Sequence, residues 1–120
     1  MGITYTTVTI KPLSNTGKSY KAEFLVDTGA IDCVVPAKEL EEIGVERTGQ
    51  KMYELADSSR VRFDFGLIQI EVMDEITAGR VVFGPEETDP ILGVTALESA
   101  ALKVNPVTNE VEKLPASLLK

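Results

Sequence analysis

The chain of 120 residues has 43% apolar and 26% charged residues, a length and composition typical of one globular domain spanning residues 1–120. Its formal net charge of −7 argues against nucleic acid as a partner, because phosphate backbones are bound by clustered Lys and Arg. The lack of histidine, with a single cysteine, excludes Ser-His and Cys-His nucleophile pairs and histidine-built metal sites. Any proton transfer near neutral pH therefore falls to carboxylates, lysines or tyrosines.

The N-terminal residues 1–5 carry neither the basic nor the apolar stretch of a signal peptide. No run in the chain approaches the ~20 apolar residues that cross a bilayer. Cys33 has no second cysteine in its own chain with which to form a disulfide. The sequence therefore predicts no membrane partner and a reducing, cytoplasmic location.

Two strands are predicted at the start of the chain. Residues 3–10 are rich in Thr, Val, Ile and Tyr, which favour pleated structure. The turn cluster Ser-Asn-Thr-Gly at 14–17 predicts a hairpin into a second strand at 20–27. One face of that second strand is charged at first and becomes apolar just before Asp27. This change predicts that the strand enters the interior as it reaches Asp27.

A strand, a helix and a hairpin are predicted next. Residues 33–35 form a short apolar strand, and 36–42 a short helix with proline early and Gly44 as its stop. Strands at 50–56 and 60–65 then form a hairpin with the polar tip Asp-Ser-Ser. In the second strand apolar and polar residues alternate, so one face packs and the other meets water.

The rest of the chain also consists mainly of short strands. Two are predicted near 67–73 and 79–83, and a third within the apolar run 90–94. Thr95, with Glu three residues later, is a candidate N-cap for a helix through residue 102. A turn at 105–109 separates two last extended pieces. Eight or nine short strands with one or two small helices predict an all-β fold, a small closed barrel.

Three features of the sequence combine into a pattern. An apolar strand ends in Asp-Thr-Gly-Ala at 27–30, a second apolar run ends in Ile-Leu-Gly at 91–93 before a helix, and the hairpin 51–65 lies between them. This pattern resembles the retropepsin-like (clan AA) aspartic proteases, in the single-lobe form found in bacteria. The likeness covers residues 5–112, including the turn-and-strand ending from residue 103 onward.

The resemblance implies an aspartic endopeptidase with Asp27 as its catalytic residue and neither metal nor other cofactor. The supporting residues that it implies in the active-site loop are Thr28, Gly29 and Ala30. The flap residues that it implies for binding an extended peptide substrate are Ala56, Asp57 and Ser58.

Amide hydrolysis of this kind needs two carboxyl groups, one to activate water and one to protonate the substrate, and a close pair shares one proton. The chain contains one Asp-Thr-Gly, and the run 91–93 has no aspartate in the corresponding place. We therefore predict a homodimer in which Asp27 from each subunit forms the catalytic pair.

Other interpretations stay open at this point. Asp-Thr-Gly is also good turn chemistry, and any hairpin turn can read Asp-Ser-Ser. Ile31 stands where retroviral proteases carry an acid, and Asp32 is interpreted as a solvated or turn acid. Val94 and Thr95 replace the Arg and the Asn or Asp that hold retroviral dimers together. These departures allow a non-catalytic peptide-binding or dimerisation module on the same fold, or a plain barrel. Cys33 is interpreted as a small core residue.

Overall fold

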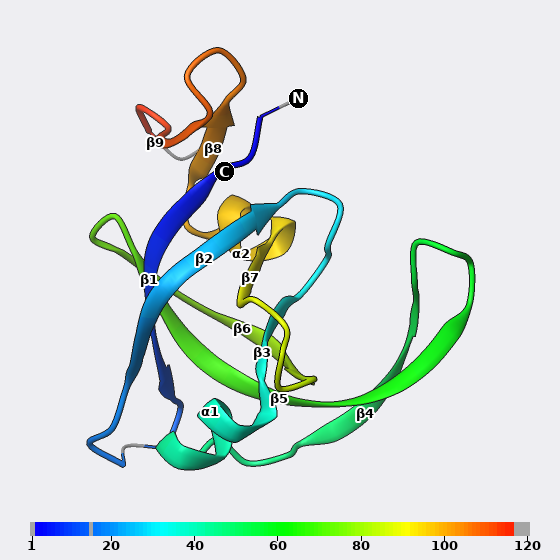
Figure 1. Ribbon diagram of the computed structural model, residues 1–120. Helices are drawn as coiled ribbons and strands as arrows, with labels where there is room; N and C mark the ends of the chain where they lie inside the picture. Colours follow the sequence, from blue (N-terminus) through cyan, green and yellow to red (C-terminus); the bar gives the residue numbers. More distant parts are fainter. Residues whose placement is uncertain (1, 15, 117–120) are drawn as a thin grey trace.

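The structure is a computed structural model and describes residues 2–14 and 16–116. Most of these residues lie in strands, and two short helices join them (Figure 1). In chain order the elements are β1 (Tyr5–Pro12), β2 (Tyr20–Asp27), β3 (Cys33–Pro36), α1 (Ala37–Ile43), β4 (Gly49–Glu54), β5 (Arg60–Val72), β6 (Glu75–Gly84), β7 (Ile91–Gly93), α2 (Val94–Ser99), β8 (Leu102–Asn105) and β9 (Glu110–Lys113).

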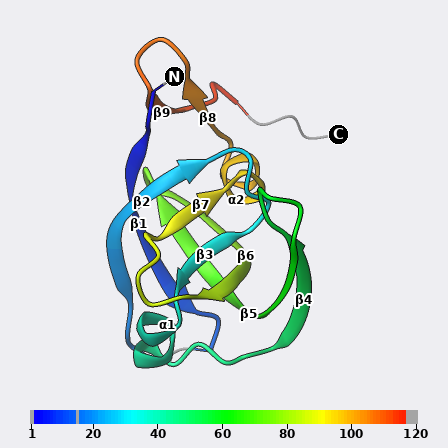
Figure 2. The same cartoon turned by 45° about the vertical axis from the view of Figure 1, so that its right-hand side comes forward.

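Six strands close into a barrel, which confirms the predicted all-β closed-barrel class. Their order is β1-β2-β7-β3-β6-β5, and the antiparallel pairing of β5 with β1 closes the ring. The neighbours β2, β7 and β3 run side by side across the front of Figure 2. Strand β4 pairs with β5 but lies outside the ring, so the two strands extend from the barrel as a long hairpin (Figure 1, green). Strands β8 and β9 form a separate two-stranded sheet.

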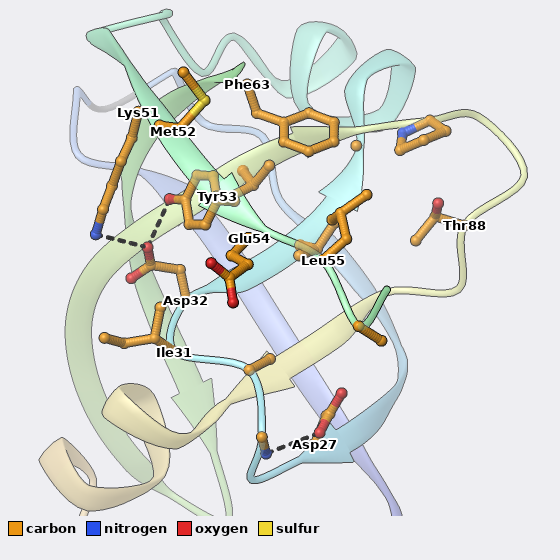
Figure 3. A pocket seen from close by; sticks show the side chains of 17 residues that line it. Asp27, Ile31, Asp32, Lys51, Met52, Tyr53, Glu54, Leu55, Phe63 and Thr88 are labelled. Carbon is orange, nitrogen blue, oxygen red and sulfur yellow. Dashed lines mark hydrogen bonds and ion pairs between the residues drawn. The ribbon is translucent and has the colours of Figure 1, made fainter. Parts of the chain in front are cut away.

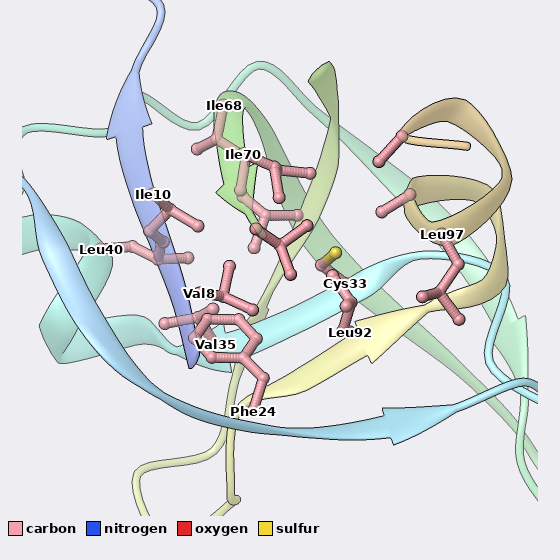
Figure 4. Packing of buried hydrophobic residues seen from close by; sticks show 14 of the residues in the cluster. Val8, Ile10, Phe24, Cys33, Val35, Leu40, Ile68, Ile70, Leu92 and Leu97 are labelled. Carbon is pink, nitrogen blue, oxygen red and sulfur yellow. The ribbon is translucent and has the colours of Figure 1, made fainter. Parts of the chain in front are cut away.

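The barrel encloses an apolar core. Phe24 of β2 and Ile10 of β1 are fully buried, and Leu40 of α1 packs into the same cluster (Figure 4). Each such side chain stabilises the fold by about 1.5–3 kcal/mol through removal of apolar surface from water. Cys33 also belongs to this cluster, and burial raises the pKa of its thiol to about 11. The prediction that it is a small core residue is confirmed.

The ends of several predicted elements agree with the structure. Strand β2 has the predicted limits, and α1 stops at Gly44, whose positive φ of 86° suits glycine. The turn predicted at 14–17 includes Asn15, which lies outside the described residues, but β1 and β2 do pair as an antiparallel hairpin. The final turn also lies between two strands, β8 and β9.

Helix α2 differs from its prediction. Thr95 is not the N-cap: the helix begins at Val94, Gly93 occupies the capping position, and no side-chain hydrogen bond caps it. The helix ends at Ser99 rather than near residue 102, and Ala101 then takes a left-handed φ of 59°. The Ser/Thr-x-x-Glu pattern failed here because the loop after β2 already supplies acceptors: the N–H of Val94 donates to the Ala30 oxygen at 2.8 Å and that of Thr95 to the Ile31 oxygen at 3.4 Å.

Strand β5 is also longer than predicted. The two expected strands at 60–65 and 67–73 are one continuous strand through Gly66. A Cβ at Gly66 would lie 2.6 Å from the backbone oxygen of Glu46 and 2.8 Å from a methyl group of Val45. The glycine therefore permits a close crossing of the chain over a continuous strand and does not mark a break.

We expect Gly66→Ala to lower the free energy of unfolding by about 1–3 kcal/mol, because the added methyl group overlaps a backbone atom that cannot move aside. Gly79→Ala in β6 is the matched control, since its Cβ would meet Ile70 at an ordinary contact distance of 3.7 Å. Urea denaturation of the two variants measures the difference. Equal free energies of unfolding for the two variants would show that residues 45–46 shift to make room for the methyl group without loss of stability.

Candidate active-site cleft

A cleft of about 890 Å³ lies between the barrel and the β4–β5 hairpin (Figure 3). It is lined by the loop that follows β2, by the hairpin strand β4 and its tip, and by the ends of β3 and β6. The lining residues are Asp27, Gly29, Ala30, Ile31, Asp32, Val34, Lys51, Met52, Tyr53, Glu54, Leu55, Ala56, Phe63, Val82, Gly84, Pro85 and Thr88. Most of the lining is apolar, and its carboxylates come from three places in the chain.

Asp27 is the last residue of β2 and is half-buried at the cleft. Its side-chain oxygen Oδ1 accepts a hydrogen bond from the backbone N–H of Gly29 at 2.9 Å. Its backbone oxygen accepts another from the N–H of Ala30 at 3.1 Å. These two bonds form a tight turn that fixes the carboxylate at the end of the strand. Thr28 is exposed and does not line the cleft, whereas Gly29 and Ala30 do.

Strand β7 and the residue that follows it position the loop after β2 through close backbone contacts. It runs parallel to β2, with Gly93 opposite Asp27. A Cβ at Gly93 would lie 2.6 Å from the backbone oxygen of Asp32 and 3.0 Å from that of Ala30. The N–H of Val94 also donates to the Ala30 oxygen at 2.8 Å. The sequence pattern that ends in Gly93 thus marks a place where two backbone segments touch.

The tip of the hairpin is a compact turn. The N–H of Leu55 donates to the Ser59 oxygen at 2.8 Å, and the N–H of Ser58 donates to the Leu55 oxygen at 2.9 Å. Asp57 accepts hydrogen bonds from the hydroxyl and the N–H of Ser59, which lower the pKa of its carboxyl. Of the three predicted flap residues, Ala56 lines the cleft, whereas Asp57 and Ser58 do not.

Asp32 is predicted to be a solvated or turn acid; it does lie in the bend between β2 and β3, but it is not solvated. Its side chain is 9% exposed, and its oxygen Oδ2 accepts a hydrogen bond from the Tyr53 hydroxyl at 2.7 Å. The same oxygen lies 3.4 Å from the guanidinium of Arg80 and 3.9 Å from Nζ of Lys51. Figure 3 shows Tyr53 and Lys51 reaching from the hairpin toward this carboxylate. Asp32 is thus paired with two cations and a hydroxyl.

The alternation of β4 gave a signal for this cluster. Lys51 and Tyr53 are two residues apart and so share the inner face of the strand, while Met52 between them is exposed. Burial, and then the hydrogen bond to Asp32, raise the pKa of Tyr53 to about 12. The phenol therefore stays protonated and donates its hydrogen bond over the whole physiological range.

The rim of the cleft exposes apolar side chains. Ile31 in the loop after β2 is 55% exposed, and Met52 and Leu55 on the hairpin are also exposed. Such a rim around a groove is typical of a binding site for another molecule. Among the described residues no group of three or more Cys, Asp and Glu side chains could hold a metal ion. Neither of the two helices in the described part has the length and apolar character to span a membrane.

A scan against protein-family models gives no match for this sequence, and a search of curated proteins finds none either. The fold and the cleft therefore carry the functional argument, together with the sequence pattern around Asp27.

We expect the Tyr53 phenol to ionise near pH 12, whereas an ordinary tyrosine ionises near pH 10. Because the pKa is raised in the folded state, its contribution to stability is complete below pH 10 and is lost as the pH rises through 12. Near-ultraviolet absorbance of phenolate during an alkaline titration measures this step, and Tyr53→Phe should remove it. If Tyr53→Phe instead removes a phenol that ionises near pH 10, the hydroxyl is not held as described.

Proposed function

We propose that the protein is an aspartic endopeptidase of the retropepsin-like type that acts as a homodimer. The single observation that supports this most strongly is the position of Asp27. It stands at the end of an interior strand, in a glycine-flanked turn, at the edge of a cleft covered by a hairpin.

The proposed chemistry requires a second carboxyl group beside Asp27. Among the residues that the structure describes, two other acids line the cleft, and both have partners: Asp32 is held by Tyr53 and two cations, and Glu54 lies 3.6 Å from Arg60. We infer that the second acid is Asp27 of another copy of the chain, across a two-fold axis. The two carboxyl groups share one proton, so one acts as base toward water and the other as acid toward the substrate.

The proposed substrate is a peptide in extended conformation. An extended chain in the cleft would lie between Gly29 and Ala30 in the loop after β2 and the hairpin tip with Ala56. The apolar lining favours apolar side chains in the substrate, and main-chain groups of the hairpin can add strand-like hydrogen bonds. The buried free thiol of Cys33 is compatible with a reducing compartment, and we propose the cytoplasm.

We expect Asp27→Asn to reduce peptide cleavage by about a hundredfold or more, because the amide can neither accept nor deliver the catalytic proton. Digestion of a peptide library, followed by mass spectrometry, measures the rate. Asp74→Asn is the matched control: Asp74 is exposed in the β5–β6 turn, outside the cleft, and asparagine tolerates its φ of 66°. Equal cleavage by the wild type and Asp27→Asn would rule out Asp27 as the catalyst.

A mixing experiment tests the shared site. If each active site takes one Asp27 from each chain, excess Asp27→Asn protein draws wild-type chains into inactive mixed dimers. The activity per wild-type chain then falls in proportion to the wild-type fraction of all chains. Sedimentation velocity at micromolar concentration measures the dimer directly. Activity that is unchanged by the excess variant would mean that one chain suffices.

The alternative is a non-catalytic peptide-binding or dimerisation module on the same fold. Exposed Ile31 at the cleft favours it, since retroviral proteases carry an acid at this place. Binding of extended peptides by wild-type protein, without cleavage under mildly acidic or neutral conditions, would support the module and exclude the protease.

A further inference from the structure

The cluster around Asp32 joins three parts of the molecule. Asp32 lies between the loop of Asp27 and strand β3, Arg80 belongs to β6 of the barrel, and Tyr53 belongs to β4 of the hairpin. Tyr53 and Arg80 are 21 and 48 residues away from Asp32 along the chain. The cluster therefore connects segments that no local structure would bring together.

Strand β4 needs such a connection more than the barrel strands do. Each strand of the ring pairs with neighbours on two sides, whereas β4 pairs with β5 alone. On its inner face, the shortest polar contact from β4 to the loop beyond Asp27 is the Tyr53–Asp32 hydrogen bond of 2.7 Å. The ring of Tyr53 also packs against that of Phe63 in β5, at 6.2 Å between centroids.

We propose that Asp32 is a positioning residue that, with Tyr53, forms a latch holding the β4–β5 hairpin closed over the cleft. The latch is a property of the fold, and its effect on catalysis rests on the proposed function. Hydrogen bonds to a charged group are stronger than neutral ones, so one contact at this place shifts the balance between open and closed hairpin.

Arg80 makes the latch reversible. Lys51 and Tyr53 move with the hairpin, but Arg80 stays with the barrel and lies 3.4 Å from Asp32. The guanidinium of Arg80 stacks over the ring of Phe65, 5.0 Å from its centroid, and this cation–π contact keeps the cation in place. When the hairpin opens, the Asp32 charge is therefore still compensated. Opening then avoids the penalty of an unpaired buried charge.

Hydrogen exchange of the full chain tests the latch with Tyr53→Phe, which removes one hydroxyl and keeps the aromatic ring. Strand β4 pairs with β5 alone, so its amides report the separation of β4 from β5, which loss of the tie to Asp32 makes easier. Where exchange reports that opening, we expect amides of residues 49–60 to exchange about tenfold faster or more, the loss implied for one hydrogen bond to a charged group. Amides of β1 and β2 should keep their wild-type rates. Tyr5→Phe, at an exposed tyrosine of β1, is the matched control and should change nothing in the hairpin.

Asp32→Asn is the second variant, since it removes the charge and keeps the size of the side chain. We expect the same faster exchange in the hairpin. Unchanged hairpin exchange in both variants overturns the latch. So does an equal acceleration across β1, β2 and the hairpin, because the residues would then support the whole fold.

Peptide cleavage adds a readout that separates the latch from the proposed function. A latch that closes the hairpin over substrate predicts that Tyr53→Phe raises KM by more than it lowers kcat. A fall in kcat alone would overturn the positioning role. If the wild-type protein cleaves no peptide, the protease proposal fails, and hydrogen exchange alone decides the latch.

Discussion

The whole site depends on a close approach between two backbone segments at Gly93. Strands β2 and β7 run parallel and end at the same edge of the barrel, so Asp27 and Gly93 lie opposite each other. The loop beyond Asp27 then crosses Gly93 so closely that a Cβ on Gly93 would lie 2.6 Å from the backbone oxygen of Asp32. The missing side chain thus sets the position of both acids, Asp27 in the turn before the contact and Asp32 directly at it.

The two acids that this contact places differ in surroundings and so in what they can do. Asp27 is half-buried at the open cleft, and its only side-chain hydrogen bond among the described residues comes from the N–H of Gly29. Asp32 is enclosed by Tyr53, Arg80 and Lys51. A carboxylate with cations and a hydroxyl around it is stabilised as a structural charge, whereas one at a cleft is free to meet a substrate or a second chain.

The hairpin shows how the barrel combines rigidity with a movable part. The ring strands have neighbours on both sides and a continuous apolar core, so they open only with the whole fold. Strand β4 lies outside the ring, and apart from its backbone pairing with β5 its polar contacts with the loop after β2 run through side chains. A further side-chain contact lies just before β4 begins, where Nε of Arg47 donates a hydrogen bond to Asp64 of β5 at 2.8 Å. Such side-chain contacts can break one at a time, so the hairpin can move over the cleft without disrupting the barrel.

The sequence by itself determined the strand nature of most of the chain, the limits of β2, the stop of α1 at Gly44, and the exclusion of histidine chemistry. These follow from period-two alternation, from glycine's freedom at positive φ, and from composition, all of which act locally. Only the tertiary structure decided that β5 continues through Gly66, that α2 starts without a Thr95 cap, and that Asp32 is buried against Tyr53 and Arg80. Each of these depends on atoms that lie far away in the sequence or on the path of the neighbouring backbone. Alternation in β4 places Lys51 and Tyr53 on one face, but no local pattern identifies Asp32 as their partner.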